Sequence, residues 1–446
     1  MNREVTRGPW PGLRPAWVEV DLEAIAGNVR TLAAEVAPAR LLAVVKADAY
    51  GHGAVPVARA AVRAGAAWLG VALVEEAQEL RRAGISAPVL VLSEPHPAAA
   101  DACAADRIAV TLCTREGVRA FGMAGWRAGR PVAAQLKVDT GMHRQGCDPA
   151  ELPGLVAAAL AEPGLEVEGL WSHFAVADEA AKTAATDAQL ARFRDALAAA
   201  AAAGLEPRWR HLANSAGATV RADARFDLVR TGIEVYGLAP SEELAGQVRA
   251  RLRPALALRA AVSAVRTVEA GERVSYGHRW EAPRRTRIAT LPVGYADGLR
   301  RGLSGRIRVR VGGTDLPQVG TVTMDQVMVD AATTDIEVGQ VATLLGDPAK
   351  GEPGVGEWSA ALGTIDYEVT CGLSPRLPRV HHRVGQPTGQ RVTQEAFGSG
   401  SKASERHQGR PGRPGTDGSR PEPGHAPEAG RPATTRPGGR PPGGGT

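Results

Sequence analysis

The chain of 446 residues contains only four cysteines, and just 4% of its residues are aromatic. Cys103, Cys113, Cys147 and Cys371 show no Cys-x-x-Cys spacing, which argues against a zinc site or a disulfide framework. We therefore expect no bound metal and a reducing, cytoplasmic environment. The sequence also lacks a run of about 18 apolar residues. Residues 1–13 have charges and prolines but no apolar core, so we expect neither a membrane span nor a secretory signal.

The net charge of +5 comes mostly from the last segment. Residues 386–446 carry nine basic and five acidic side chains, whereas residues 1–385 carry 44 basic and 43 acidic side chains. The basic balance therefore predicts no nucleic-acid partner. The last segment also contains 14 glycines, 10 prolines and almost no large apolar side chain. It cannot bury enough surface to offset the entropy of ordering, so we interpret it as a disordered tail without a catalytic role.

Between residues 40 and 233, short apolar runs alternate with segments of helical character, such as Val74–Ala83 and the alanine-rich Asp187–Ala203. This alternation predicts a parallel sheet covered by helices, and eight runs predict an eight-stranded, TIM-like α/β barrel. The eight runs are Leu41–Val45, Trp68–Leu73, Pro88–Leu92, Ile108–Leu112, Ala133–Val138, Val167–His173, Trp209–Ala213 and Asp227–Ile233.

After Pro240 the pattern changes to alternating apolar and polar residues, which is typical of antiparallel strands. We therefore predict an N-terminal extension (1–14), the barrel (15–250), a C-terminal and mostly antiparallel β domain (251–385) and the tail (386–446). The clearest strand-like segments of the β domain are Ala255–Val265, Thr286–Pro292, Ile307–Val311, Gln326–Val329 and Gln340–Leu345.

The segment from Ala43 to Gly53 carries the strongest chemical signal. It reads Ala-Val-Val-Lys-Ala-Asp-Ala-Tyr-Gly-His-Gly, and a lysine where a strand meets a loop can form an imine with an aldehyde cofactor. These eleven residues resemble the pyridoxal phosphate lysine motif of bacterial alanine racemases. The resemblance implies that Lys46 holds pyridoxal 5'-phosphate and that the Tyr50 hydroxyl bonds its phosphate. For an isolated lysine, a surface position at a strand end is the alternative interpretation.

The resemblance covers about residues 15–385 and has architectural consequences. In this family a barrel is followed by a β domain. The first strand, here about Trp17–Val20, joins the sheet of that second domain. The family's active site forms at a dimer interface, so the resemblance implies a homodimer in which each site draws on both chains.

Further polar residues close the later strands of the predicted barrel, where the active sites of such barrels gather. A phosphate needs small residues, hydroxyls and backbone N–H groups, and Ser215 with Gly232 fits that need. A helix cap is an equally good interpretation of Ser215. The cofactor contacts that the resemblance implies are Lys46, Tyr50, His173, Asn214, Ser215, Arg230, Gly232, Ile233 and Tyr367.

Arg230 is the most diagnostic of these residues. Most pyridoxal enzymes keep the ring nitrogen protonated with a carboxylate, and an arginine cannot accept that proton. Facing the nitrogen, Arg230 would weaken the ring as an electron sink; an interior arginine paired with a carboxylate is the alternative. By resemblance, Arg144 binds the substrate carboxylate. Lys137, often carbamylated in this family, would orient Arg144, whereas a Lys137–Asp139 salt bridge is the alternative.

Racemisation needs a second acid or base on the face of the substrate opposite Lys46. The segment Gly-Glu-Arg-Val-Ser-Tyr-Gly resembles the family's catalytic tyrosine motif, so we expect Tyr276 in that role; a half-buried strand tyrosine is the alternative. Two further motifs imply that Tyr295, Met324 and Asp325 line the entrance or face the substrate.

The sequence therefore predicts an alanine racemase that interconverts L- and D-alanine by a two-base mechanism and supplies D-alanine for peptidoglycan. A racemase of broader substrate range stays open, because no loop reports the side-chain pocket. A fold-related basic amino-acid decarboxylase would show a glycine triplet and a catalytic cysteine. Residues 200–240 contain no Gly-Gly-Gly, and Cys371 is not in the expected setting. A non-catalytic pyridoxal phosphate carrier has the barrel but lacks the second domain.

Overall fold

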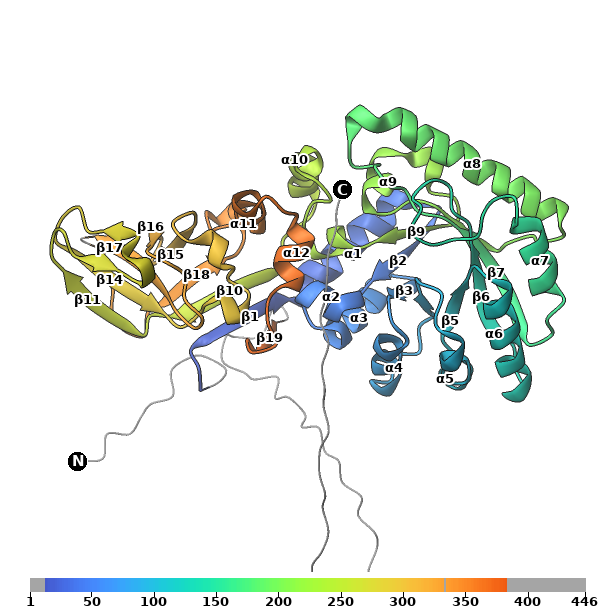
Figure 1. The fold of residues 1–446 in the computed structure, drawn as a ribbon, viewed down its shortest axis with the longest axis horizontal. Helices are drawn as coiled ribbons and strands as arrows, with labels where there is room; N and C mark the ends of the chain where they lie inside the picture. Colours follow the sequence, from blue (N-terminus) through green and yellow to red (C-terminus); the bar gives the residue numbers. More distant parts are fainter. Residues whose placement is uncertain (1–12, 333, 383–446) are drawn as a thin grey trace, which may run out of the picture. The chain divides into compact units, whose positions relative to one another are not determined.

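A computed structural model of the chain describes residues 13–332 and 334–382. The predicted tail and nearly all of the predicted N-terminal extension lie outside these residues. The described part contains an eight-stranded sheet, a nine-stranded sheet and one small two-stranded sheet. Figure 1 shows helices packed around the outside of the eight parallel strands.

The eight-stranded sheet is the barrel that the alternating pattern predicts, and this prediction is confirmed. Its hydrogen-bonded order runs from β8 through β7 down to β2 and then β9, and every paired neighbour is parallel. Two backbone hydrogen bonds join the ends β8 and β9. The strands are β2 (Arg40–Val44), β3 (Trp68–Val71), β4 (Val89–Val91), β5 (Ala109–Leu112), β6 (Val132–Lys137), β7 (Leu165–Trp171), β8 (Trp209–His211) and β9 (Leu228–Thr231).

The barrel helices form because apolar residues recur at helical spacing behind good caps. In the first, the Asp21 side chain accepts the N–H groups of Glu23 and Ala24 at 2.8 and 2.9 Å, and Ile25 and Val29 lie on the buried face. The helices are α1 (Leu22–Val36), α3 (Ala54–Arg63), α4 (Val74–Arg82), α5 (Ala100–Asp106), α6 (Arg115–Arg127), α7 (Leu152–Leu160), α8 (Thr183–Ala202), α9 (Ser215–Val220) and α10 (Glu242–Arg251).

The nine-stranded sheet has the order β11-β14-β17-β16-β15-β18-β10-β1-β19. All its pairs are antiparallel except β1 with β19. The first strand, β1, therefore belongs to the nine-stranded sheet. The next eight strands form the barrel, and later strands complete the nine-stranded sheet. The strands are β1 (Ala16–Asp21), β10 (Leu256–Ala261), β11 (Ala264–Val268), β14 (Thr286–Leu291), β15 (Arg308–Val311), β16 (Thr314–Val319), β17 (Val327–Ala332), β18 (Val341–Leu345) and β19 (Arg379–His382).

One strand expectation is wrong. The apolar segment Ala255–Val265 is two strands, β10 and β11, because the chain changes partners after Ala261. The first strand pairs with β1 and β18, and the second pairs with β14. The short strands β12 (Arg273–Val274) and β13 (Trp280–Glu281) form the two-stranded sheet, and the helices α11 (Val355–Leu362) and α12 (Asp366–Cys371) precede β19.

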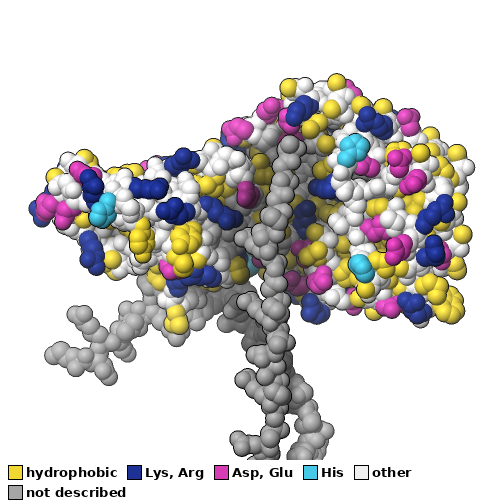
Figure 2. Space-filling view, viewed as in Figure 1, with side chains coloured by type: hydrophobic (Ala, Val, Ile, Leu, Met, Phe, Trp, Pro, Cys, Tyr) yellow, Lys and Arg dark blue, Asp and Glu magenta, His cyan; other side chains and the backbone are white. Residues whose placement is uncertain are grey.

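The described surface carries charges of both signs. Figure 2 shows basic and acidic side chains interspersed over the visible face rather than a continuous basic stripe. Such a mixed surface gives no electrostatic footprint for nucleic acid on that face. Within residues 13–332 and 334–382, no helix is long and apolar enough to cross a membrane.

Candidate active site

Lys46 opens an unusual turn at the end of β2. In this turn, α2 (Lys46–Gly51), four consecutive non-glycine residues, Ala47–Tyr50, have φ angles of 51–54°. A left-handed turn costs roughly 1–2 kcal/mol per residue, so surrounding bonds must hold it. The N–H of Ala47 donates to the Glu76 carboxylate at 2.7 Å. The Asp48 carboxylate accepts the N–H of Ala54, also at 2.7 Å.

The turn also contacts His52 and, near Thr370, the helix α12. Nδ1 of His52 lies 3.0 Å from the carbonyl oxygens of both Ala49 and Tyr50, so this nitrogen carries the ring proton. Burial lowers the pKa of His52 to about 4. A Cβ on Gly51 would collide with the carbonyl oxygen of Thr370 in α12. The lysine turn is therefore held by groups far away in the sequence.

Lys46 is half-buried, unlike a surface lysine. Burial lowers the pKa of Lys46, and the Arg144 guanidinium lowers it further. Only the neutral amine attacks an aldehyde. A lowered pKa increases the neutral fraction of the Lys46 amine at a given pH.

Beside the turn, Tyr50, Ser215, Gly232 and Tyr367 form a hydroxyl-lined cradle. The N–H of Gly232 donates to Oγ of Ser215 at 2.9 Å. A Cβ at Gly232 would come within 2.6 Å of the Tyr50 hydroxyl. The ring centroids of Tyr50 and Tyr367 lie 5.8 Å apart. Small residues, hydroxyls and backbone N–H groups are what a bound phosphate needs.

The cap interpretation of Ser215 is wrong. The cap of α9 is Asn214, whose Oδ1 accepts the N–H of Gly217 at 2.9 Å. The Ser215 hydroxyl instead turns toward the end of β9. Ile233, the remaining cradle candidate, is fully buried directly after this loop. The amide of Asn214 therefore orders the helix start beside the cradle.

Arg230 on β9 is buried and bound entirely by uncharged acceptors. Its Nη1 donates to Nδ1 of His211 at 2.8 Å. Its Nη2 donates to the carbonyl oxygens of Ser172 and Leu212 at 2.7 and 3.0 Å and lies 3.0 Å from Nδ1 of His173. No described carboxylate pairs with Arg230, so the paired-arginine alternative is wrong. Burial, followed by the Arg144 charge, lowers the pKa of Arg230 to about 9.

Trp171 at the end of β7 is a site residue that the sequence did not reveal. Nζ of Lys137 and Cζ of Arg230 lie 4.3 and 4.6 Å from the centroid of its rings. The imidazole of His211 stacks on it at 5.4 Å and 8°. An aromatic face attracts cations, so an indole rather than a carboxylate holds these two charges. A tryptophan two residues before His173 was the available signal.

Lys137 at the end of β6 is buried and makes no salt bridge with Asp139. The Asp139 carboxylate instead accepts three backbone N–H groups, those of residues 141–143, at 2.8–3.1 Å. The salt-bridge alternative for Lys137 is therefore wrong. Burial lowers the pKa of Lys137 to about 8.

Arg144 is exposed in the loop that follows β6. The other candidates lie in the β domain on three loops that are joined by hydrogen bonds. Thr321 Oγ1 donates to the carbonyl of Tyr276 at 2.7 Å, and the N–H groups of Tyr295 and Ala296 donate to the carbonyls of residues 323 and 324 at 2.9 and 3.0 Å. The side chains of Tyr276, Tyr295 and Met324 are 73%, 40% and 53% exposed. We call these three the exposed triad.

Tyr276 lies in a single 3₁₀ turn, η5 (Tyr276–His278), so the half-buried strand alternative is wrong. A cavity of about 380 Å³ opens beside it, lined in part by Ser275, Thr323 and Met328. Asp325 accepts a hydrogen bond from Arg376 at 2.7 Å. Among the described residues, no hydrogen bond or ion pair joins the exposed triad or Asp325 to the barrel. The candidate residues therefore form two separate groups within one chain.

A parallel barrel with a partly desolvated lysine after its first strand, a hydroxyl-lined cradle and a buried arginine is typical of barrel enzymes that use a lysine-bound cofactor. Comparison with known proteins identifies the kind. Residues 20–240 match the family model for the N-terminal domain of alanine racemase, and residues 255–381 match the model for its C-terminal domain. The chain belongs to the alanine racemase family, whose members are pyridoxal phosphate-dependent isomerases.

Individual relatives agree with this assignment. The alanine racemase of Symbiobacterium thermophilum is 47% identical over 371 residues, which cover 83% of this chain and 98% of that protein. The crystal structure of alanine racemase from Streptomyces lavendulae is 43% identical, with a TM-score of 0.79 over 83% of this chain and 98% of that one. The Bacillus anthracis structure with bound L-Ala-P is 38% identical, with a TM-score of 0.79 over 84% and 97% of the two chains.

Proposed function

We propose that this protein interconverts L- and D-alanine with pyridoxal 5'-phosphate held on Lys46. The observation that carries the proposal is the grouping of three elements at the C-terminal end of the barrel. These are the desolvated Lys46, the cradle of Tyr50, Ser215, Gly232 and Tyr367, and the buried Arg230. Lys46 suits the aldehyde of the cofactor, the cradle suits its phosphate, and Arg230 suits its ring nitrogen.

The residues present fit the cofactor chemically. The cradle offers hydroxyls, and the absence of a Cβ at Gly232 leaves room beside the Tyr50 hydroxyl. Arg230, whose described partners are all uncharged acceptors, keeps its charge for a ring nitrogen, with His173 beside it. When bound, pyridoxal phosphate withdraws electrons from the α-carbon of an attached amino acid, which makes the α-proton removable.

Each remaining task falls to a side chain of this protein. Lys46, as a neutral amine, takes and returns the α-proton on one face of the substrate. Tyr276 does so on the opposite face, and Arg144 binds the substrate carboxylate. Arg230 donates a hydrogen bond and keeps its proton, because a pKa of about 9 leaves the guanidinium charged at neutral pH.

The exposed triad leads us to propose a homodimer with shared sites. Tyr276, Tyr295 and Met324 project together from neighbouring loops and are 40–73% exposed. Within residues 13–332 and 334–382, no hydrogen bond or ion pair joins them to the barrel, so a cluster of this kind suits an interaction surface. In a two-fold dimer, the triad of each chain completes the barrel site of its partner. Asp325 and Met324 then face the substrate at the entrance of that site.

We also propose that Lys137 is carbamylated. A carbamate forms when a neutral lysine amine adds CO₂ and releases one proton. The pKa of about 8 makes a substantial neutral fraction available near physiological pH. The resulting anion would carry a charge opposite to that of Arg144 and would orient its guanidinium.

In the cell, we propose that the enzyme works in the cytoplasm and that its D-alanine supplies peptidoglycan synthesis. All four cysteines are free thiols, which is typical of a reducing compartment. Three of them are buried, and burial raises the pKa of these thiols, so they stay protonated and inert.

A panel of L-amino acids tested for exchange of the α-hydrogen with solvent and for D-product tests this function. Rapid exchange and racemisation of alanine, with slow reaction of larger side chains, is the expected result. Equal rates across the panel would instead indicate a broad racemase. Release of CO₂ from a basic amino acid would indicate a decarboxylase.

A further inference from the structure

A chain of hydrogen bonds runs from Arg230 through the interior of the barrel toward its opposite end. Nη1 of Arg230 contacts Nδ1 of His211 at 2.8 Å. Nε2 of His211 contacts Oε1 of Gln135 at 2.7 Å. Nε2 of Gln135 then donates to Glu168 at 3.4 Å, the longest link of the three. These residues come from β9, β8, β6 and β7, so the chain crosses the barrel.

The direction of every bond follows from Arg230. A guanidinium has only donors, so Nδ1 of His211 must accept and its proton must sit on Nε2. That proton needs an acceptor, so Gln135 must turn its carbonyl oxygen toward His211. The amide nitrogen of Gln135 then needs an acceptor in turn, and the carboxylate of Glu168 supplies one. This arrangement gives an acceptor to the Nε2 proton of His211 and to one amide hydrogen of Gln135.

The middle of the chain is completely buried. Gln135 and His211 each have 0% exposure, so a missing partner would not be replaced by solvent. Gly169 makes room for the amide, because a Cβ there would lie 3.0 Å from Cγ and Cδ of Gln135. Trp171 fixes the plane of His211 by stacking. The surroundings therefore allow one position for each link.

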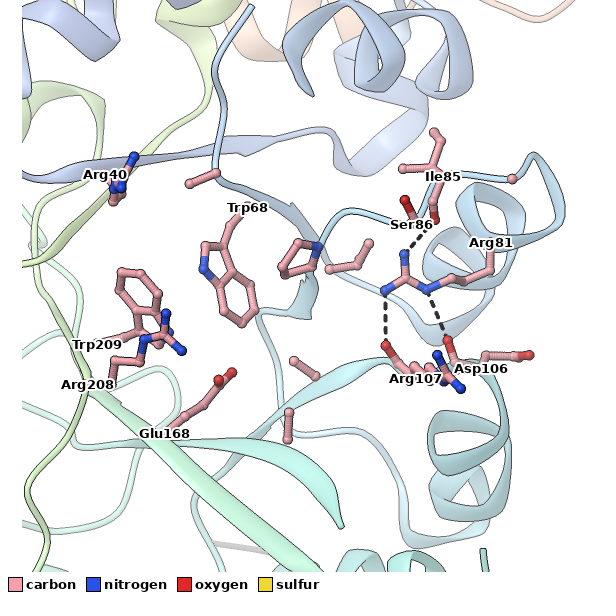
Figure 3. A pocket seen from close by; sticks show the side chains of 16 residues that line it. Arg40, Trp68, Arg81, Ile85, Ser86, Asp106, Arg107, Glu168, Arg208 and Trp209 are labelled. Atoms are coloured by element: carbon pink, nitrogen blue, oxygen red, sulfur yellow. Dashed lines mark hydrogen bonds between the residues drawn. The ribbon is translucent and has the colours of Figure 1, made fainter. Parts of the chain in front are cut away.

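The far end of the chain opens into a cavity of about 760 Å³ at the N-terminal mouth of the barrel. Figure 3 shows Glu168 at this cavity, with Arg208, Trp209 and Trp68 around it. Burial raises the pKa of Glu168, whereas the Gln135 hydrogen bond and Arg208 oppose that rise. The carboxylate thus reaches the edge of solvent, while its neighbour Gln135 lies inside the barrel.

We propose that Gln135 and Glu168 are positioning residues that bind the Nε2 proton of His211 and orient its ring, and thereby hold Arg230 at the cofactor end of the barrel. The link to catalysis rests on the proposed function, because it needs Arg230 to face the cofactor ring. The hydrogen-bond chain itself does not need the cofactor. The two ideas are therefore tested separately.

The first test uses the protein without cofactor and labelled with ¹⁵N-histidine. Long-range ¹H–¹⁵N spectra identify which ring nitrogen is protonated, and the His211 signal is assigned by its loss in His211→Gln. The wild type is expected to carry the proton on Nε2. Gln135→Met, which keeps the length but removes both bonds, should shift this signal and speed exchange of the proton with solvent.

Glu168→Gln tests transmission along the chain. It removes the terminal charge two links from His211 and should still shift the His211 signal, by less than Gln135→Met. Glu166→Gln is the matched control, because it removes the same charge from an exposed position two residues earlier on β7 and should leave the signal in place. Gly169→Ala keeps every polar group but crowds Gln135, and should also move the signal.

The second test uses the enzyme loaded with cofactor. Gln135→Met should lower kcat about tenfold with little change in KM, which is the scale of one lost buried hydrogen bond. Glu168→Gln should lower it about two- to threefold, and Glu166→Gln should have no effect. A proton on Nδ1 of wild-type His211, or an unmoved signal in Gln135→Met and Gly169→Ala, would overturn the proposal. A second outcome would overturn only the proposed role of Arg230. In it, the His211 signals behave as expected, but an Arg230 variant keeps the cofactor absorbance spectrum of the wild type.

Discussion

The barrel and the β domain present their candidate groups in opposite ways. In the barrel, Lys46 sits in a braced left-handed turn and Arg230 is buried among four acceptors. In the β domain, Tyr276, Tyr295 and Met324 project from hydrogen-bonded loops into the open. The first group is partly or fully buried by its own chain. The second group is supported by its loops and is exposed on its outer side.

This difference separates two ways of preparing an active site. Groups that must keep an unfavourable state, such as an uncharged lysine or an unpaired arginine, need a desolvated and rigid setting. Groups that meet the substrate from the opposite side need only a rigid loop and a second surface that packs against them. We infer that a second copy of the chain supplies that surface. The predictions below act first on the barrel group and finally on both groups together.

The largest effect is expected for Lys46→Ala. Loss of the covalent anchor and of one proton carrier should lower kcat at least about a thousandfold. The purified variant should also lack the visible band that borohydride removes from the wild type. Lys182→Ala, which changes an exposed lysine paired with Glu179, is the control and should behave as wild type. A variant that kept the reducible band would contradict the assignment.

Arg230→Glu should have the next largest effect. A carboxylate facing the ring nitrogen would favour its protonation, make the ring a stronger electron sink and add a long-wavelength absorbance band during turnover. We expect the racemisation rate to fall about a hundredfold, the scale for removing one preorganised donor. Rapid-scanning absorbance during turnover measures both. An active variant with an unchanged spectrum would count against the placement of Arg230.

Lys137 should show a smaller, pH-dependent effect. Its pKa of about 8 means that the neutral amine becomes more abundant as the pH rises toward 8, so carbamylation should increase over that range. A carbamate signal should appear in ¹³C spectra after addition of ¹³C-bicarbonate and vanish in Lys137→Met. The variant should lose about tenfold in activity. No carbamate signal at any pH would reject the modification.

The last single-residue prediction concerns stability and should leave activity at neutral pH nearly unchanged. The pKa of buried His52 is lowered from 6.5 to about 4, so folding disfavours its proton. Its contribution is fully present above the unfolded pKa and is lost as the pH falls toward 4, up to about 3 kcal/mol. Denaturant unfolding of His52→Gln should show a weaker loss of stability between pH 7 and pH 4 than wild type. An equal loss in both proteins would show that His52 does not titrate as stated.

The sequence predicted the barrel because each of its strands is a short apolar run separated by a helical segment. It pointed to Lys46 and Arg230 because they close such runs within segments that resemble the motifs of alanine racemases. It could not predict the left-handed turn, since Ala47–Tyr50 contains no glycine to signal positive φ. Nor could it find the chain of Gln135 and His211, because those contacts join different strands across the barrel interior. Their side chains look like ordinary interior polar residues until the strands are closed into a ring.

The choice between Asn214 and Ser215 as a helix cap shows the same limit on a smaller scale. Both residue types are good caps, and only the fold decides which side chain reaches the free N–H group. The split of Ala255–Val265 into two strands likewise depends on which neighbours each half pairs with. Pairing across a sheet is set by the whole domain, so local pattern cannot supply it.

The shared site is tested most directly by mixing two inactive variants, Lys46→Ala and Tyr276→Phe. In a mixed dimer, one site carries both changes and the other carries neither. Random mixing makes half the dimers mixed, each with one intact site, so co-refolding should restore up to about a quarter of wild-type activity if the sites act independently. If both residues served the same chain's site, every site would carry one change. Equal mixing, verified by native mass spectrometry, without recovered racemisation would contradict the shared site.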